Sequence, residues 1–112
     1  MKLKHWYAVY GTDVEDMPRL AQAISHVFEG EISERNSSYI GDYSKIIINM
    51  SKDHIPSEIK IRRNIDLEFG GLEEPDYPQF KLLIYISRIA DLKYLEEKLK
   101  NFNLYRISLR EI

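Results

Sequence analysis

The chain has 112 residues, of which 44% are hydrophobic and 30% are charged, a balance typical of one globular domain. Its 16 Lys and Arg against 18 Asp and Glu give a net charge of −2, which provides no general attraction to nucleic acid or anionic lipid. The sequence contains no cysteine, which excludes disulfides, thiolate metal sites and a cysteine nucleophile. We expect residues 1–112 to form a single cytoplasmic domain, since no apolar run suits a signal peptide or a membrane helix.

The N-terminal part predicts a strand followed by a helix. Residues 3–10 are aromatic and β-prone, and residues 16–28 carry apolar side chains at helical spacing. Pro18 favours a helix start near Asp16, whereas a capping box from Thr12 to Glu15 favours a start one turn earlier.

A hairpin and two further strands follow in the sequence. Residues 31–40 and 43–50 predict a hairpin closed by a two-residue turn at Gly41 and Asp42. Residues 57–67 alternate apolar and polar side chains, which predicts a strand with one buried face. Residues 79–87 are apolar on both faces, which is typical of a central strand.

The C-terminal part predicts a helix over 90–101, whose leucines form one stripe, and a last strand over 104–110. The element order is therefore β-α-β-β-β-β-α-β. This order predicts an α+β two-layer sandwich that resembles an elaborated ferredoxin-like fold. We expect an antiparallel or mixed sheet with two helices on one face and an open second face.

Motifs for catalysis or metal binding are absent from the sequence. His5, His26 and His54 are isolated from one another, and the chain has no phosphate-binding glycine loop and no nucleophile elbow. The carboxylate pairs, such as Glu73 with Glu74, are typical of solvated loops. We expect a protein that is not an enzyme and that needs no metal and no cofactor.

The open face of the sheet is one candidate binding surface. Period-two alternation places one set of side chains toward the core: Ile46, Ile48, Met50, Ile59, Ile61, Ile107 and Leu109. The opposite set is basic with interleaved tyrosines: Tyr43, Lys45, Asn49, Lys60, Arg62, Arg106 and Arg110, with Lys81 and Tyr85 beside them. Such a face suits a nucleic-acid-binding or small-ligand regulatory module, although solvated sheet faces also carry cations that discourage aggregation.

An acidic stretch is a second candidate. It contains five carboxylates and no Lys or Arg, and it ends beside Tyr77: Asp66, Glu68, Glu73, Glu74 and Asp76. A loop of this kind can steer a basic protein, and it can equally be a solvated acidic loop.

The hairpin is a third candidate. The two-residue turn would place Arg35 opposite Ile48 and Ser37 opposite Ile46, so that polar side chains point toward the core. Such a conflict is typical of a functional or strained site, and an edge strand or a bulge would also produce it.

The same segment carries a family resemblance. Glu34-Arg35-x-Ser37-Ser38-Tyr39-x-Gly41-x-Tyr43 is similar to a motif of small bacterial immunity proteins that accompany polymorphic or contact-dependent growth-inhibition toxins. The resemblance implies a non-catalytic inhibitor that binds a cognate toxin domain, often a nuclease. It implies a monomer in a 1:1 complex, with no membrane partner and no nucleic acid.

The residues expected to bind the toxin come from the hairpin and the acidic stretch. Tyrosines would be the anchors and carboxylates would supply the complementary charge. The set comprises Arg35, Tyr39, Asp42, Tyr43, Asp66, Glu68, Glu73, Glu74, Asp76 and Tyr77.

Overall fold

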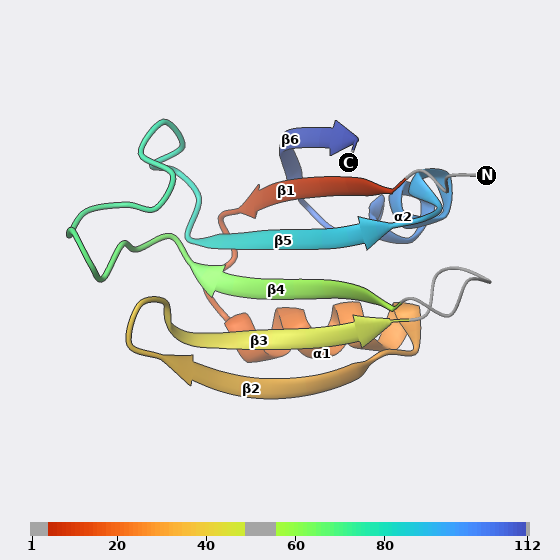
Figure 1. Cartoon of the computed structure of the whole chain (residues 1–112), viewed down its shortest axis with the longest axis horizontal. Helices are drawn as coiled ribbons and strands as arrows, with labels where there is room; N and C mark the ends of the chain where they lie inside the picture. The colour runs from red at the N-terminus through yellow and green to blue at the C-terminus, as the bar shows by residue number, and fades with distance from the viewer. Residues whose placement is uncertain (1–4, 49–55, 112) are drawn as a thin grey trace.

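The computed structural model describes residues 5–48 and 56–111. These residues form a six-stranded antiparallel open sheet in the order β2-β3-β4-β5-β1-β6, together with two helices (Figure 1). The elements in chain order are β1 Trp6–Thr12, α1 Met17–Phe28, β2 Glu31–Ser37, β3 Gly41–Ile48, β4 Ser57–Arg63, β5 Leu82–Ile89, α2 Leu92–Leu99 and β6 Tyr105–Glu111. The α+β class and the order β-α-β-β-β-β-α-β predicted from the sequence are confirmed.

Both helices cover the same face of the sheet. α1 packs on β2, β3 and β4, and its Ile24 is fully buried in a core that also contains Ile46 and Ile59. Leu95 of α2 belongs to the same core cluster. β1 lies between β5 and β6, the two strands that α2 connects, which is the split arrangement of a ferredoxin-like fold. No helix formed by residues 5–48 and 56–111 covers the second face of the sheet.

The start of α1 resolves the two competing cap signals in favour of Asp16. The Asp16 carboxylate accepts a hydrogen bond from the Arg19 amide at 3.2 Å, and Pro18 lies in the first turn. Thr12 is the last residue of β1, and its hydroxyl donates to the Asn103 carbonyl at 3.0 Å. The capping box is not formed because Thr12 is still paired with Leu82 in the sheet.

The register predicted for the hairpin is wrong. Residues 38–40 form the turn, and Gly41 begins β3 with a positive φ of 83°. Arg35 consequently pairs with Tyr43 instead of Ile48, an odd shift that moves Arg35 and Ser37 to the open face. The conflict with the core therefore disappears. Glu34 takes the helix-side position, where its carboxylate accepts a hydrogen bond from the Ser44 hydroxyl at 2.9 Å.

A bulge in β6 overturns the predicted position of Arg106. Val9 of β1 pairs with Ser108, whereas the next residue, Tyr10, pairs with Arg106, so Ile107 is the extra residue. Arg106 therefore lies on the helix side, where its guanidinium forms an ion pair with Glu96 of α2 at 2.9 Å.

The strands that flank the acidic stretch are displaced from their predicted bounds. β4 ends at Arg63 and β5 begins at Leu82, so the connecting loop covers residues 64–81. α2 begins later than predicted because Asp91 caps it, accepting a hydrogen bond from the Tyr94 amide at 3.0 Å, and it ends at Leu99, earlier than predicted. The predictions for Asn49, Met50 and His54 lie outside the described residues.

Leu95 tests the position of α2 on the sheet. Replacing this fully buried side chain by alanine removes its packing and leaves a cavity, so we expect Leu95→Ala to lower the free energy of unfolding by about 3 kcal/mol. Urea unfolding followed by circular dichroism measures the change. The matched control is Leu67→Ala, which removes the same atoms from an exposed loop and should cost less than about 1 kcal/mol. Equal losses would show that α2 does not pack as described.

Candidate functional site

Asn64 anchors the loop of residues 64–81 to the end of the sheet. Its amide nitrogen donates to the carbonyls of Tyr77 and Phe80 at 3.2 and 3.1 Å, and its amide oxygen accepts from the Glu74 backbone at 2.8 Å. The side chain is buried, so each of these bonds is sheltered from water. One residue at the end of β4 thus fixes three points of a long loop.

An aromatic cluster holds the second half of this loop against the open face. The rings of Tyr77, Phe80 and Tyr105 have centroids 5.7 to 6.0 Å apart. Phe80 lies over Gly11, where a Cβ atom would come within 2.3 Å of its ring. A larger residue at this point of β1 would displace the Phe80 ring from its present position. Tyr77, predicted as a partner anchor, packs within this cluster and is half-buried.

The acidic loop and the basic open face are in contact with each other. Arg62 is only 8% exposed, donates to the Ile65 carbonyl at 3.0 Å and lies 3.6 Å from the Glu73 carboxylate. Burial, followed by the charges of Glu74 and Glu73, raises the pKa of Tyr85 to about 12. Glu73 and Glu74 therefore interact with side chains of the open face of the same molecule: Glu73 with Arg62, and both with Tyr85.

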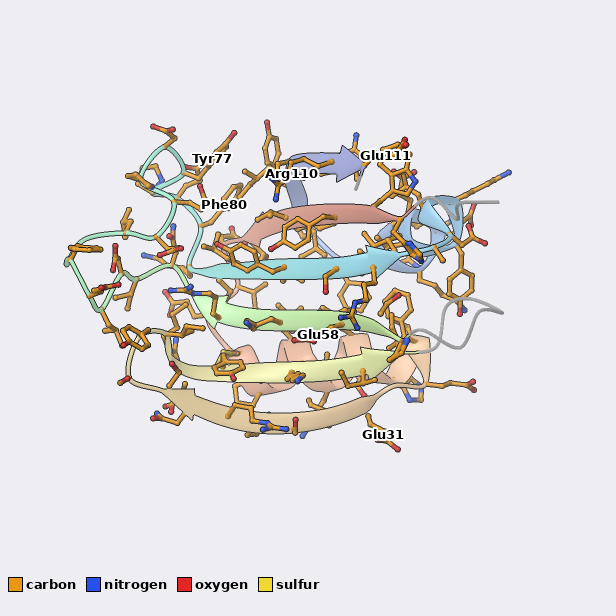
Figure 2. The ribbon with its side chains drawn as sticks, in the orientation of Figure 1. Glu31, Glu58, Tyr77, Phe80, Arg110 and Glu111 are labelled. Atoms are coloured by element: carbon orange, nitrogen blue, oxygen red, sulfur yellow. The ribbon has the colours of Figure 1, made fainter. Side chains whose placement is uncertain are left out.

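The other cations of the open face also have neighbours on it, as Figure 2 allows the reader to follow. Lys45 lies 3.9 Å from the Glu58 carboxylate, and Lys60 lies over the Tyr43 ring at 5.4 Å. Arg110 lies over the Tyr7 ring at 5.2 Å. Tyr43, predicted as a second anchor, is half-buried beneath Lys60.

The β2–β3 turn and the first part of the loop lie at the same end of the sheet (Figure 1) and carry three strongly exposed large apolar side chains. A fourth, Tyr105, is 56% exposed and belongs to the aromatic cluster. We call Tyr39, Leu67 and Phe69 the apolar tip; they are 66%, 52% and 83% exposed. The two segments lie close together, because a Cβ atom at Gly41 would come within 3.1 Å of Leu67. An exposed group of large apolar side chains is typical of a surface that binds another protein.

The backbone of the tip is held by a tight turn. The Asp66 carboxylate accepts hydrogen bonds from the amides of Glu68 and Phe69 at 3.0 and 3.1 Å. The Gly70 amide donates to the Asp66 carbonyl at 2.9 Å, and Gly70 and Gly71 both have φ of 79°. The Phe69 side chain is thus exposed to solvent while its backbone amide is hydrogen-bonded to Asp66.

Three carboxylates lie in or directly after the two turns that carry the apolar tip. Asp66 and Glu68 belong to the same turn, and Asp42 follows the hairpin turn, where it accepts a hydrogen bond from the Asn36 amide at 2.7 Å. The structure thus brings four predicted residues to one end of the sheet: Tyr39, Asp42, Asp66 and Glu68. The remaining six lie elsewhere. Arg35 and Tyr43 are on the open face, Glu73 and Glu74 line its contact with the loop, and Asp76 adjoins Tyr77 in the aromatic cluster.

Sequence reasoning missed Leu67 and Phe69. Leu67 fits the apolar alternation of residues 57–67, so the sequence places it in that strand and not in the acidic loop. One feature of the sequence could have revealed them. Gly70 and Gly71 directly follow these two residues and indicate a turn, so the strand must end before residue 67.

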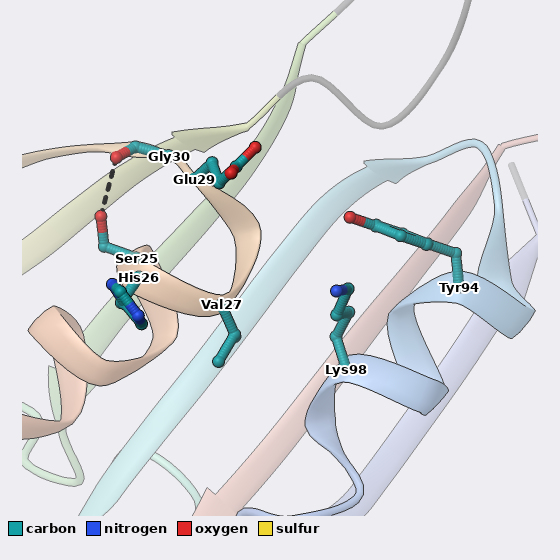
Figure 3. A pocket seen from close by; sticks show the side chains of 7 residues that line it. All are labelled: Ser25, His26, Val27, Glu29, Gly30, Tyr94 and Lys98. Carbon is teal, nitrogen blue, oxygen red and sulfur yellow. Dashed lines mark hydrogen bonds between the residues drawn. The ribbon is translucent and has the colours of Figure 1, made fainter.

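A cleft of about 640 Å³ separates the two helices on the other face (Figure 3). Tyr94 and Lys98 of α2 line one side, and His26 and Val27 of α1 line the other. The Ser25 hydroxyl donates to the Gly30 carbonyl at 2.8 Å, which secures the end of α1. The lining mixes both signs of charge and selects no ligand class.

Within residues 5–48 and 56–111, no cluster of three or more His, Asp or Glu is arranged to hold a metal ion. Neither of the two described helices has the length and apolar character needed to cross a membrane. No protein-family model matches the chain, and no curated protein shows significant sequence similarity to it.

Asn64 provides a test of how the site is supported. Asn64→Ala removes three buried hydrogen bonds and leaves backbone groups unpaired, so we expect a loss of about 2 kcal/mol in the free energy of unfolding. Amide hydrogen exchange across residues 64–81 should rise in parallel. The control is Asn36→Ala, which removes one exposed hydrogen bond and should cost about 0.5 kcal/mol or less. Unchanged exchange in Asn64→Ala would refute the anchoring role.

Tyr85 provides a pH test. Its folded pKa of about 12 lies above the ordinary value of 10.0, so the fold favours the protonated hydroxyl. The corresponding stability is complete below pH 10 and is lost as the pH rises toward 12. Urea midpoints measured at about pH 8 and about pH 11 should therefore fall less for Tyr85→Phe than for the unaltered chain. An equal fall in both proteins would contradict the assignment.

Proposed function

We propose that this chain is a non-catalytic inhibitor that binds a basic protein partner through the apolar tip. The carrying observation is the exposure of Phe69, Leu67 and Tyr39 at one end of the sheet, on segments that also carry the acids Glu68 and Asp42. Exposing a phenylalanine to this extent on an ordered turn does not stabilise a monomer, and it is typical of a binding surface.

Hydrogen bonds within the loop hold the apolar tip in one conformation before any partner binds. The Asp66 turn and the Asn64 anchor reduce the freedom that the loop would lose on binding. A smaller entropy loss leaves more of the contact energy as affinity. Phe69 is the natural central anchor, because large aromatic side chains seated in a partner pocket dominate many protein interfaces.

The charge around the tip indicates the chemistry of the partner. Glu68, Asp66 and Asp42 would face a basic surface and would accelerate the approach of such a protein. A nuclease toxin domain has this property, because its substrate is a polyanion. The resemblance of the Arg35–Tyr43 segment to toxin immunity proteins is consistent with this partner, and Tyr39 of that segment belongs to the tip.

The open face gives less support to the alternative of nucleic-acid binding. Arg106 lies on the helix side, Arg62 is buried beside Glu73, and Lys45 lies beside Glu58. Phosphate binding would have to displace these carboxylates, which costs part of the electrostatic attraction.

Co-expression is the direct test of the proposed function. The chain would be produced together with candidate toxin domains taken from reading frames next to its gene, and growth of the host and recovery of a complex would be measured. Protection and a 1:1 complex support the proposal, whereas unprotected growth with no complex excludes it for that toxin.

Kinetic measurements separate the roles of the anchor and the charges. We expect Phe69→Ala to accelerate dissociation of the complex at least about tenfold, with little change in association. We expect Glu68→Lys to slow association about threefold to tenfold at low salt and to lose this effect at high salt. Surface plasmon resonance measures both rates.

The control for the charge variant is Glu97→Lys on α2, a carboxylate whose side chain is 63% exposed and which lies outside the tip. It makes the same change in net charge and should leave both rates within about twofold. If Glu97→Lys slows association as much as Glu68→Lys does, overall charge and not the tip steers the partner.

A further inference from the structure

β2 is an edge strand of the sheet, on the side that α1 covers (Figure 1). β2 pairs only with β3, and its register runs without a shift from Glu31 to Ser37. The opposite edge strand, β6, contains the bulge at Ile107. A regular exposed edge offers backbone donors and acceptors to another strand, whereas a bulged edge discourages such pairing.

We propose that β2 is a self-association edge, at which a second copy of this chain adds its own β2 in antiparallel orientation. The residues of β2 complement one another in one register, centred on Ser33. In that register Arg35 of each copy lies directly opposite Glu31 of the other, and all four side chains are on the open face. The two copies would continue one sheet across a twofold axis.

In the free protein Arg35 donates one long, exposed hydrogen bond to the Ser33 hydroxyl at 3.4 Å, and its charge is otherwise available for pairing. Arg35 and Glu31 are both exposed, and no ion pair joins either of them to another residue in the described part of the chain. Figure 2 shows Glu31 beside the outer edge of β2. On the helix side, Ile32 is 37% exposed and would become the diagonal neighbour of its symmetry mate, which removes two apolar side chains from water.

Neighbouring registers are less favourable. A register centred on Glu34 places the two Glu34 carboxylates opposite each other, and one centred on Arg35 does the same to two guanidinium groups. A register centred on Ile32 shortens the overlap of the two strands and leaves Arg35 without a partner. The charge pattern therefore selects the register centred on Ser33.

This pairing is independent of the proposed function and compatible with it. Since the strands are antiparallel, the two β2–β3 turns would lie at opposite ends of the dimer. Both apolar tips would stay accessible, and each could bind one partner. Failure of the dimer would leave the role of the tip unaffected.

Sedimentation of the pure protein, from micromolar to millimolar concentration, tests the proposal. We expect a weak dimer that dissociates on dilution, since a pair of edge strands buries a small area. Arg35→Glu alone and Glu31→Arg alone should each weaken self-association at least tenfold, because like charges then face each other. An equimolar mixture of these two variants restores both ion pairs, so it should form a heterodimer at least as stable as the original dimer.

The sedimentation results distinguish a β2-mediated dimer from its absence. Concentration-dependent dimers that the single variants lose and the mixture recovers support the proposal. A monomer at every concentration overturns it, and so does a dimer that neither variant weakens or a mixture that stays monomeric. Unchanged urea unfolding of both variants, which alter exposed side chains, excludes misfolding as the cause.

Discussion

The anchoring of the loop by Asn64 is the interaction on which the candidate site depends. The loop of residues 64–81 is long, and without a fixed point its acids and apolar side chains would have no defined position. Asn64 bonds to its backbone at Glu74, Tyr77 and Phe80. Because the amide is buried, losing any one of these bonds would leave an unpaired polar group in the protein.

The remainder of the site follows from this fixed point. Phe80 lies on Gly11, which brings the loop down onto the open face, and Glu73 then lies beside Arg62. The loop neutralises part of the basic face by this contact. Its other end is directed toward the hairpin turn, where Leu67 approaches Gly41. The acidic loop and the basic open face, which are separate in the sequence, are thus one continuous surface. Some acids of the loop, such as Glu73, pair with the open face, and others, such as Glu68, lie in the exposed turn of the tip.

Periodicity was sufficient to predict the elements, and it failed where the backbone departs from regular structure. The apolar spacing of α1 and the continuous apolar run of β5 identified both correctly. The hairpin register depended on the turn at residues 38–40 and the positive φ of Gly41, which the spacing of side chains does not encode. The bulge at Ile107 likewise placed Arg106 on the unexpected face. Tyr39, which the sequence singled out, lies at the apolar tip, whereas Phe69 was not singled out because it belongs to no periodic pattern.

If the apolar tip meets the protein partner, binding should protect it from amide hydrogen exchange, which can be measured with and without a toxin domain recovered in complex with the chain. Exchange should slow at residues 38–42 and 65–72 and stay unchanged in α2 and β6. Slowed exchange confined to the helices or to the β6 edge, with none at the tip, would rule out this role of the tip.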